Sequence, residues 1–196
     1  VIEAKKPTFK GSLWGVRANL SALERQVRFV DEDMNRLWFP SIIRNIEKTP
    51  EEELESSERR EMKRLLPLLE RLIPEASGEP VIIADLHSFS SEGCLFTITA
   101  DNEKSIRLLS HLYAPMVFGI EHVLRGTTLR YFQDLGHLTF AFEGGQHEDE
   151  LAVYNIKAAM FVLLRQIGCL RADAAPGITE FEQHLAEYTR NVPTRV

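Results

Sequence analysis

Three clusters of polar residues in this sequence carry side chains that could do chemistry. They occupy residues 28–36, 85–91 and 143–147, and each follows a segment that we expect to be a strand. In open α/β sheets, ligands bind beyond the carboxyl ends of the strands. The three clusters are therefore the first candidates for a functional site.

Residues 28–36 have a composition that suits an anionic ligand. Arg28 and Arg36 lie at the two ends of this cluster, and Asn35 directly precedes Arg36. A guanidinium group can bind a carboxylate through two hydrogen bonds, and an amide can add a further one. The alternative interpretation is a surface loop that is held by ion pairs among its alternating charges.

The second cluster contains a histidine that could bind a metal ion. Because side chains alternate between the two faces of a strand, Asp85 and His87 share one face. A carboxylate near an imidazole can orient the ring for metal binding. The alternative for His87 is a purely structural role.

The third cluster places a carboxylate at the end of an apolar strand. Glu143 follows the apolar residues 140–142 and is itself followed by Gly144 and Gly145, which allow close approach of the backbone. Apolar surroundings raise the pKa of a carboxyl group, which suits a general base. The alternative is a glutamate that caps the helix that follows.

Alternating strands and helices would position these clusters. Apolar runs predict strands at residues 81–86, 94–99, 116–120 and 138–142, the first of them buried on both faces, and residues 10–19 predict a strand that leads into a loop. Helical periodicity predicts helices at residues 51–73, with Pro67 kinking or dividing the helix, and then from Asp101, at 147–167 and at 178–188. This alternation predicts an α/β fold with a mixed, largely parallel sheet between helices.

The composition argues against several classes of function. The 196 residues are 44% hydrophobic, which favours one globular domain. A formal net charge of -6 at pH 7 argues against nucleic acid as a partner, and no apolar run is long enough to cross a membrane. Two cysteines are too few for a disulfide framework, so we expect a reducing cytoplasm. The formation of homo-oligomers stays open.

In their order and spacing, the three clusters resemble the succinylglutamate desuccinylase/aspartoacylase family, whose fold is similar to that of the zinc carboxypeptidases. The family pattern has an arginine, an aromatic residue, an acidic pair and then Asp-Leu-Asn-Arg. It is matched here by Arg28-Phe29 and by Asp33-Met34-Asn35-Arg36, with methionine in place of leucine. A strand end and a later glutamate of the family are matched by Asp85-Leu86-His87 and Glu143-Gly144. The resemblance covers nearly the whole chain.

The resemblance implies a zinc ion and roles for five residues. Zinc would be bound by His87 and by an upstream His-x-x-Glu pair, and it would lower the pKa of its bound water to about 7. Glu143 would be the general base, and Arg28 would stabilise the developing oxyanion. Asn35 and Arg36 would bind the carboxylate of a small anionic substrate. We leave Arg125 and Arg130, which could add substrate contacts, out of the catalytic set.

Two parts of the family pattern are missing. No histidine precedes His87, so the upstream His-x-x-Glu pair is absent, and a truncated or unrecorded beginning accounts best for its loss. We expect residues 1–190 to form the zinc hydrolase catalytic domain without its N-terminal metal-ligand segment. We expect residues 191–196 to be a stub of a C-terminal β domain.

The expected function is zinc-dependent hydrolysis of the amide bond of an N-acyl amino acid or a related small acidic compound. The chain as it stands would lack zinc ligands that this activity needs. A metallocarboxypeptidase is the enzyme alternative, because it would use the same residues on the C-terminal residue of a peptide. An alternative of another class is a metal-free module that binds carboxylates through Asn35 and Arg36.

Overall fold

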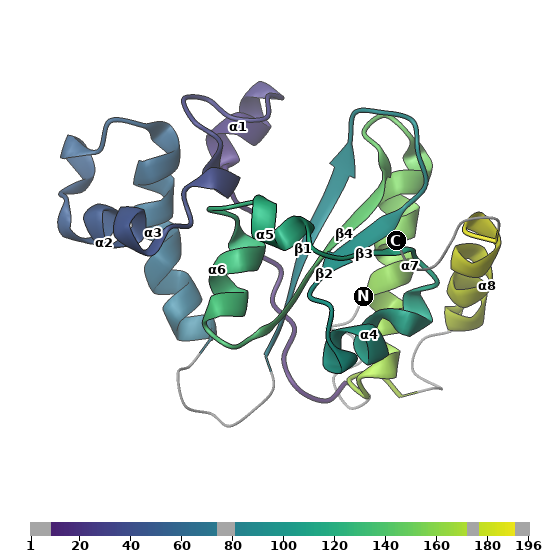
Figure 1. The fold of residues 1–196 in the computed structure, drawn as a ribbon. Coiled ribbons are helices and arrows are strands. Elements are labelled where there is room, and N and C mark those ends of the chain that lie inside the picture. The colour runs from purple at the N-terminus through teal and green to yellow at the C-terminus, as the bar shows by residue number, and fades with distance from the viewer. Residues whose placement is uncertain (1–8, 74–80, 172–176, 191–196) are drawn as a thin grey trace. The chain divides into compact units, whose positions relative to one another are not determined.

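The computed structural model describes residues 9–73, 81–171 and 177–190, and the chain divides into two compact units. The sheet unit comprises Val1–Ser12, Ala84–Glu121 and Thr139–Val196. The helical unit comprises Leu13–Ile83 and His122–Leu138. Each unit is thus assembled from segments that are far apart in the sequence (Figure 1).

A mixed sheet forms the centre of the sheet unit. Its strands are β1 (Ile82–Phe89), β2 (Phe96–Thr99), β3 (Met116–Val117) and β4 (Leu138–Gln146), in the order β1-β4-β2-β3. The pairing of β2 with β3 is parallel, and that of β2 with β4 is antiparallel. The Val81 carbonyl accepts from the Leu138 amide and the Phe89 carbonyl from the His147 amide, so β1 and β4 run in the same direction. The predicted mixed, largely parallel sheet is confirmed.

Helices pack around this sheet. They are α4 (Glu103–Leu109), which continues into the 3₁₀ turn η4 (Ser110–Leu112), α7 (Glu150–Gln166) and α8 (Ile178–Tyr188). Helix α5 (Ile120–Val123) lies where the chain passes from the sheet unit to the helical unit. Helix α7 packs against both α4 and α8 (Figure 1). Its buried residues include Ala152, Ala158 and Ala159, whose small side chains let neighbouring backbone come close.

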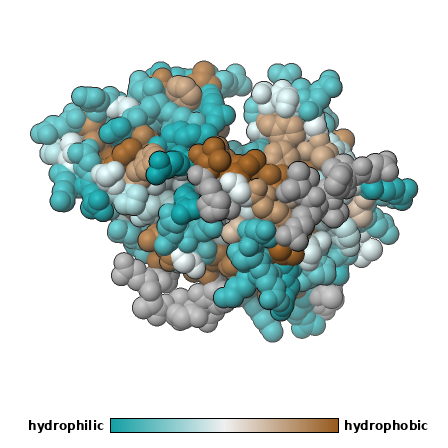
Figure 2. Space-filling view, in the orientation of Figure 1, coloured by the Kyte–Doolittle hydropathy of each residue, from teal (hydrophilic) through white to brown (hydrophobic). Residues whose placement is uncertain are grey.

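The helical unit has its own apolar core. Its elements are α1 (Leu20–Arg25), the 3₁₀ turns η2 (Met34–Arg36) and η3 (Glu51–Glu53), α2 (Pro40–Lys48), α3 (Ser57–Leu72) and α6 (Thr128–Asp134). The core is formed by buried side chains from most of these elements: Met34, Leu37, Trp38, Ile43, Ile46, Leu54, Met62, Leu65, Leu66 and Phe132. The surface over α2 and α3 is mainly hydrophilic (Figure 2). Burial of one face and hydration of the other explains why these charge-rich helices form here.

Residues 10–19 do not form the predicted strand. Phe9 makes an isolated antiparallel bridge with Leu170, and the chain then continues without regular structure to α1. The apolar side chains of Leu13, Trp14 and Val16 are exposed, because this segment pairs with none of the described strands. The apolar pattern alone was therefore misleading.

Two further predictions about elements are wrong in part. Pro67 does not divide α3, because buried side chains on its preceding turns, including Met62, Leu65 and Leu66, hold one continuous helix. Strand β1 is not buried on both faces, since it lies at an edge of the described sheet and Leu86 is 41% exposed. It also continues to Phe89, three residues past its predicted end at residue 86.

The other predicted elements are confirmed within a few residues, and α2 and α6 were not predicted. The expected stub at residues 191–196 lies outside the described residues. Among the helices that the structure describes, none is both long and apolar enough to cross a membrane.

Candidate functional site

A buried carboxylate holds the first cluster in place. Glu58, in the first turn of α3, is 0% exposed. Its Oε1 accepts a hydrogen bond from the Val30 amide at 2.6 Å, and its Oε2 accepts from the amides of Asp31 and Glu32 at 3.2 and 3.4 Å. Three consecutive backbone N–H groups of the loop therefore bind one side chain of the helix. Charge-assisted bonds of this kind are among the stronger ones in proteins.

The same loop also caps the start of α3. Oδ2 of Asp31 accepts from the Ser57 amide at 2.7 Å. The Glu32 carboxylate accepts a hydrogen bond from the Ser56 hydroxyl and forms an ion pair with Arg59, with Nε at 2.7 Å from Oε1. The Arg59 hydrogen bond lowers the pKa of Glu32 in spite of its partial burial. Side chains of α3 thus accept hydrogen bonds from backbone N–H groups of the loop, and a side chain of the loop accepts one from a backbone N–H group of α3.

The four-residue motif at 33–36 forms a 3₁₀ turn. Oδ1 of Asp33 accepts from the Asn35 amide at 2.9 Å and so caps the turn η2. Oδ2 of Asp33 accepts from Nη2 of Arg28 at 2.9 Å and from its Nε at 3.3 Å. The Arg28 side chain is 70% exposed, so its guanidinium group is held by Asp33 at the surface of the helical unit.

A segment about ninety residues later in the chain completes this cluster. Oδ1 of Asn35 accepts hydrogen bonds from the amide and the hydroxyl of Thr128, at 2.9 and 3.1 Å. A carboxylate ligand of Asn35 would therefore be bound through the Nδ2 group. Nη1 of Arg36 donates to the backbone carbonyl of Asn35 at 2.7 Å. This bond ties the exposed guanidinium group of Arg36 to the residue that precedes it.

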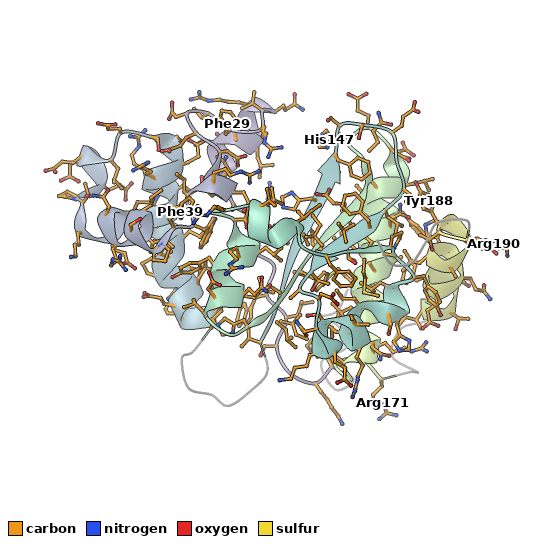
Figure 3. The ribbon with its side chains drawn as sticks, in the orientation of Figure 1. Phe29, Phe39, His147, Arg171, Tyr188 and Arg190 are labelled. Carbon is orange, nitrogen blue, oxygen red and sulfur yellow. The ribbon has the colours of Figure 1, made fainter. Side chains whose placement is uncertain are left out.

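Gly126 allows this close approach. Its φ of +72° lies in the left-handed region, and its carbonyl accepts from the Trp38 amide at 3.0 Å. A Cβ atom at this position would lie 2.6 Å from the Arg36 carbonyl oxygen and 2.4 Å from a ring carbon of Phe39. Figure 3 shows Phe39 where the chain enters α2. The glycine is thus required by both backbone angle and space.

In the sheet unit, Asp85 and His87 lie on one face of β1, as the alternation predicted. Nε2 of His87 is 2.9 Å from Oδ1 of Asp85, and both side chains are partly exposed. A carboxylate on one ring nitrogen fixes the tautomer and the ring orientation, as it does in histidines that bind metal ions. This arrangement is consistent with a ligand role for His87 and does not by itself make a metal site.

Glu143 lies within β4 and not at its end. The strand continues to Gln146, and Glu143 is paired with Phe96 of β2. Glu143 also does not cap the following helix, because the cap of α7 is Asp149, whose Oδ1 accepts from the Leu151 amide at 2.8 Å. The alternative capping interpretation is therefore wrong.

A second polar contact joins the ends of β1 and β4. Nδ1 of His147 lies 2.8 Å from the Ser88 hydroxyl, and the His147 amide donates to the Phe89 carbonyl at 2.9 Å. Figure 3 shows His147 in the loop between β4 and α7. The sequence offered one signal for this contact, a hydroxyl-rich segment directly after His87.

The predicted site residues thus fall into two groups. Arg28, Asn35 and Arg36 belong to the helical unit, where Asp33 and Thr128 bring them together. His87 and Glu143 belong to the sheet unit, on the neighbouring strands β1 and β4. Glu58 and Thr128 were not predicted from the sequence as part of this site. An isolated glutamate in a charge-rich helix gives no local signal, and Thr128 is far from residue 35 in the chain.

Zinc needs three or four donor groups from histidine, cysteine or carboxylate side chains. The structure describes residues 9–73, 81–171 and 177–190, without the side chains of residues 121 and 122. Among these described side chains, no three such groups come together. The donors that the structure describes do not by themselves fit a zinc site. His87 with its Asp85 partner supplies one donor of the right type.

Comparison with known proteins identifies the family. Residues 4–163 match the profile of the succinylglutamate desuccinylase/aspartoacylase catalytic domain. This range contains all five predicted site residues. No curated protein matches the chain significantly.

Solved structures show the same zinc carboxypeptidase-like fold. A succinylglutamate desuccinylase/aspartoacylase from Rhodobacter sphaeroides is 18% identical, with a TM-score of 0.56 over 81% of this chain and 46% of that one. The succinylglutamate desuccinylase of Chromobacterium violaceum is 19% identical, with a TM-score of 0.54 over 81% and 50%. The ectoine utilization protein EutE (DoeB) of Ruegeria pomeroyi is 16% identical, with a TM-score of 0.56 over 80% and 47%.

The chain spans about half the length of these solved structures. The profile match nevertheless covers most of its 196 residues, and the fold agrees. The chain belongs to the succinylglutamate desuccinylase/aspartoacylase family.

Proposed function

We propose that the full-length protein hydrolyses the amide bond of an N-acyl amino acid or a related small acidic compound. The observation that carries this proposal is the family match over residues 4–163, which includes the motif built around Asn35 and Arg36. Members of this family are deacylases. A cytoplasmic location agrees with two free cysteines and stays a prediction.

Asn35 and Arg36 would bind the carboxylate of the substrate. Thr128 occupies the oxygen of the Asn35 amide and so fixes which way the amide faces. Arg36 is tethered to the carbonyl of its neighbour, and its exposed guanidinium group can offer a carboxylate two parallel hydrogen bonds. Asp33 would support both, because it caps the turn that carries them.

Glu143 would act as the general base and Arg28 as the oxyanion donor. As base, Glu143 would accept a proton from the attacking water and pass it to the leaving amine, a role worth about 10²- to 10⁴-fold in rate. Arg28, oriented by Asp33, would donate to the oxygen that becomes negative in the tetrahedral intermediate. A single positioned donor of this kind contributes roughly 3 kcal/mol.

We also propose that the full-length protein binds zinc and that His87 is one of its ligands. The support is the contact of His87 with Asp85. The remaining ligands would be the upstream His-x-x-Glu pair that the family resemblance implies. When bound, zinc would polarise the scissile carbonyl of the substrate.

The first test is elemental analysis of the full-length protein together with two variants. We expect about one zinc per chain in the wild type, its loss in His87→Ala, and its retention in His111→Ala, which changes an exposed histidine of η4. Absence of zinc from the full-length wild type would overturn the metal proposal. Binding of N-acyl amino acids without hydrolysis would then identify a carboxylate-binding module.

The second test is steady-state hydrolysis of N-acyl amino acids by the same full-length protein. Glu143→Gln is expected to lower kcat by about 10²- to 10⁴-fold. Arg36→Ala is expected mainly to raise KM, because it removes a contact that substrate and transition state share. A Glu143→Gln variant with the kcat of the wild type would exclude Glu143 as the base.

A further inference from the structure

A buried amide connects β4 with α8 through α7. Asn155 lies in the middle of α7 and is 0% exposed. Its Nδ2 donates to the Gly144 carbonyl at 2.7 Å, and its Oδ1 lies 2.6 Å from Nε2 of His184 in α8. Because the Asn155 nitrogen faces a carbonyl, its oxygen faces His184, so Nε2 of His184 must carry the proton. The side-chain amide of Asn155 thus links Gly144, the residue after Glu143, to helix α8.

The backbone that Asn155 holds contains two successive glycines. Gly144 and Gly145 follow Glu143 directly, and Gly145 has a φ of +132°, a conformation that other residues rarely adopt. Two successive glycines give a chain more conformational freedom than any other pair. A side-chain hydrogen bond from a fully buried donor limits that freedom at the peptide between Gly144 and Gly145, one residue beyond Glu143.

Helix α7 also comes too close for any side chain at residue 144. A Cβ atom on Gly144 would lie 2.7 Å from the Ala152 carbonyl oxygen and 2.6 Å from Cγ1 of Ile156. The strand therefore rests directly on the helix backbone one turn before Asn155. This close packing brings the Gly144 carbonyl within reach of the amide.

His184 is itself held by aromatic rings. The Tyr154 ring meets it edge-on with centroids 4.7 Å apart, and the ring of Tyr188, on the same helix as His184, lies 5.9 Å away. Separately, Thr189 anchors the end of α8, because its hydroxyl donates to the carbonyl of Tyr113 at 2.7 Å. Thr189 thus contributes to the docking of α8 through a hydrogen bond that involves neither His184 nor Asn155.

We propose that Asn155 and His184 are positioning residues for Glu143. By fixing the Gly144 peptide, they hold the backbone that carries the Glu143 carboxylate at one orientation. This inference rests on the proposed function, in which Glu143 is the general base. Proton transfer depends steeply on geometry, and a displacement of about 1 Å can cost about 10²-fold in rate.

The test is steady-state hydrolysis of N-acyl amino acids by the full-length protein and four variants. His184→Phe keeps a ring between the two tyrosines but removes the donor, and it is expected to lower kcat about tenfold, with KM within about twofold of the wild type. His184→Gln keeps an N–H donor and is expected to restore most of kcat. Thr189→Val weakens the docking of α8 and is expected to lower the thermal midpoint while kcat stays unchanged.

The fourth variant, Glu143→Gln combined with His184→Phe, separates positioning from general destabilisation. If His184 acts through Glu143, the combined variant loses no more activity than Glu143→Gln alone. Equal kcat values for His184→Phe and wild type, or a loss in Thr189→Val as large as in His184→Phe, would overturn the inference. If the wild type is active and either of these two results is found, only the positioning role is refuted. If the wild type is inactive, the proposed function is refuted and this inference with it.

Discussion

Replacement of Glu58 by glutamine tests how the loop at residues 30–32 is held. The substitution keeps the shape of the side chain but turns one of its two oxygens into an NH₂ donor. If that donor faces Val30, one hydrogen bond of 2.6 Å is lost, and if it faces Asp31 and Glu32, two longer bonds are lost. In either orientation the NH₂ group of the glutamine faces at least one backbone N–H group of the loop. That N–H group is then left without an acceptor at a buried position.

The expected loss can be estimated from these contacts. A hydrogen bond to a charged group contributes about 1.5–3 kcal/mol, and an unsatisfied buried partner costs about 1–3 kcal/mol. Because glutamine retains one acceptor, we expect Glu58→Gln to lower the free energy of unfolding of the helical unit by about 2–4 kcal/mol. This is a large fraction of the roughly 5–15 kcal/mol of a typical domain.

The assay is urea unfolding followed by tryptophan fluorescence. The sequence has two tryptophans. Trp38 is 5% exposed in the core of the helical unit and reports on its unfolding, whereas Trp14 is largely exposed. Hydrogen exchange at the amides of residues 30–32 gives a local measure, and these amides are expected to exchange faster in the variant.

Glu61→Gln is the matched control. It removes the same charge from the same helix, and the Glu61 carboxylate accepts only from the Leu20 amide, in an exposed contact among the described residues. We expect this control to change the unfolding free energy by less than about 1 kcal/mol. A loss in Glu58→Gln that is no larger than the loss in Glu61→Gln would refute the reasoning.

Three further predictions concern the same unit. The hydrogen bond from Arg59 lowers the pKa of Glu32 below the usual 4.5. The ionised Glu32 carboxylate therefore stabilises the fold above about pH 4.5, and this contribution is lost as the pH falls through the lowered pKa. Glu32→Gln should therefore be less stable than wild type at pH 7, with a difference that shrinks in acid denaturation profiles; a constant difference would contradict the shift. Gly126→Ala should cost about 2–4 kcal/mol in urea unfolding, from the positive φ and the overlap with Phe39, and an unchanged midpoint would disprove the steric argument. Thr128→Val should weaken the binding of an N-acyl amino acid about 5- to 30-fold by calorimetry, because it removes one of the two donors that orient the Asn35 amide, and unaltered affinity would show that the Thr128 hydroxyl does not orient it.

Much of the fold could be predicted from local patterns. Strands β2 and β4 and helices α4, α7 and α8 appeared as apolar runs or helical periodicity, and α8 was predicted with its observed bounds. These patterns are legible because burial imposes a period of two on strands and of 3.6 on helices. The segment at residues 10–19 has apolar residues typical of a strand but forms none, because a strand also needs a partner strand, which a local pattern does not reveal.

The candidate site was predictable only in its motifs. Asp85 and His87 share a face because of strand geometry, and their 2.9 Å contact follows from a spacing of two residues. Asp33 capping the turn that carries Asn35 is equally local. The link between residues 35 and 128 was not predictable, because two hydrogen bonds between distant residues leave no periodic trace in either segment.

The sequence by itself determined which chemical groups this protein can use: the arginine and amide pair, the histidine beside its aspartate, and the glutamate before two glycines. Only the tertiary structure decided what holds those groups. Glu58 and Asn155 are polar residues whose roles come entirely from burial, because a polar side chain removed from water must bind whatever backbone groups its surroundings supply. Those surroundings are built from distant parts of the chain, and no local pattern encodes them.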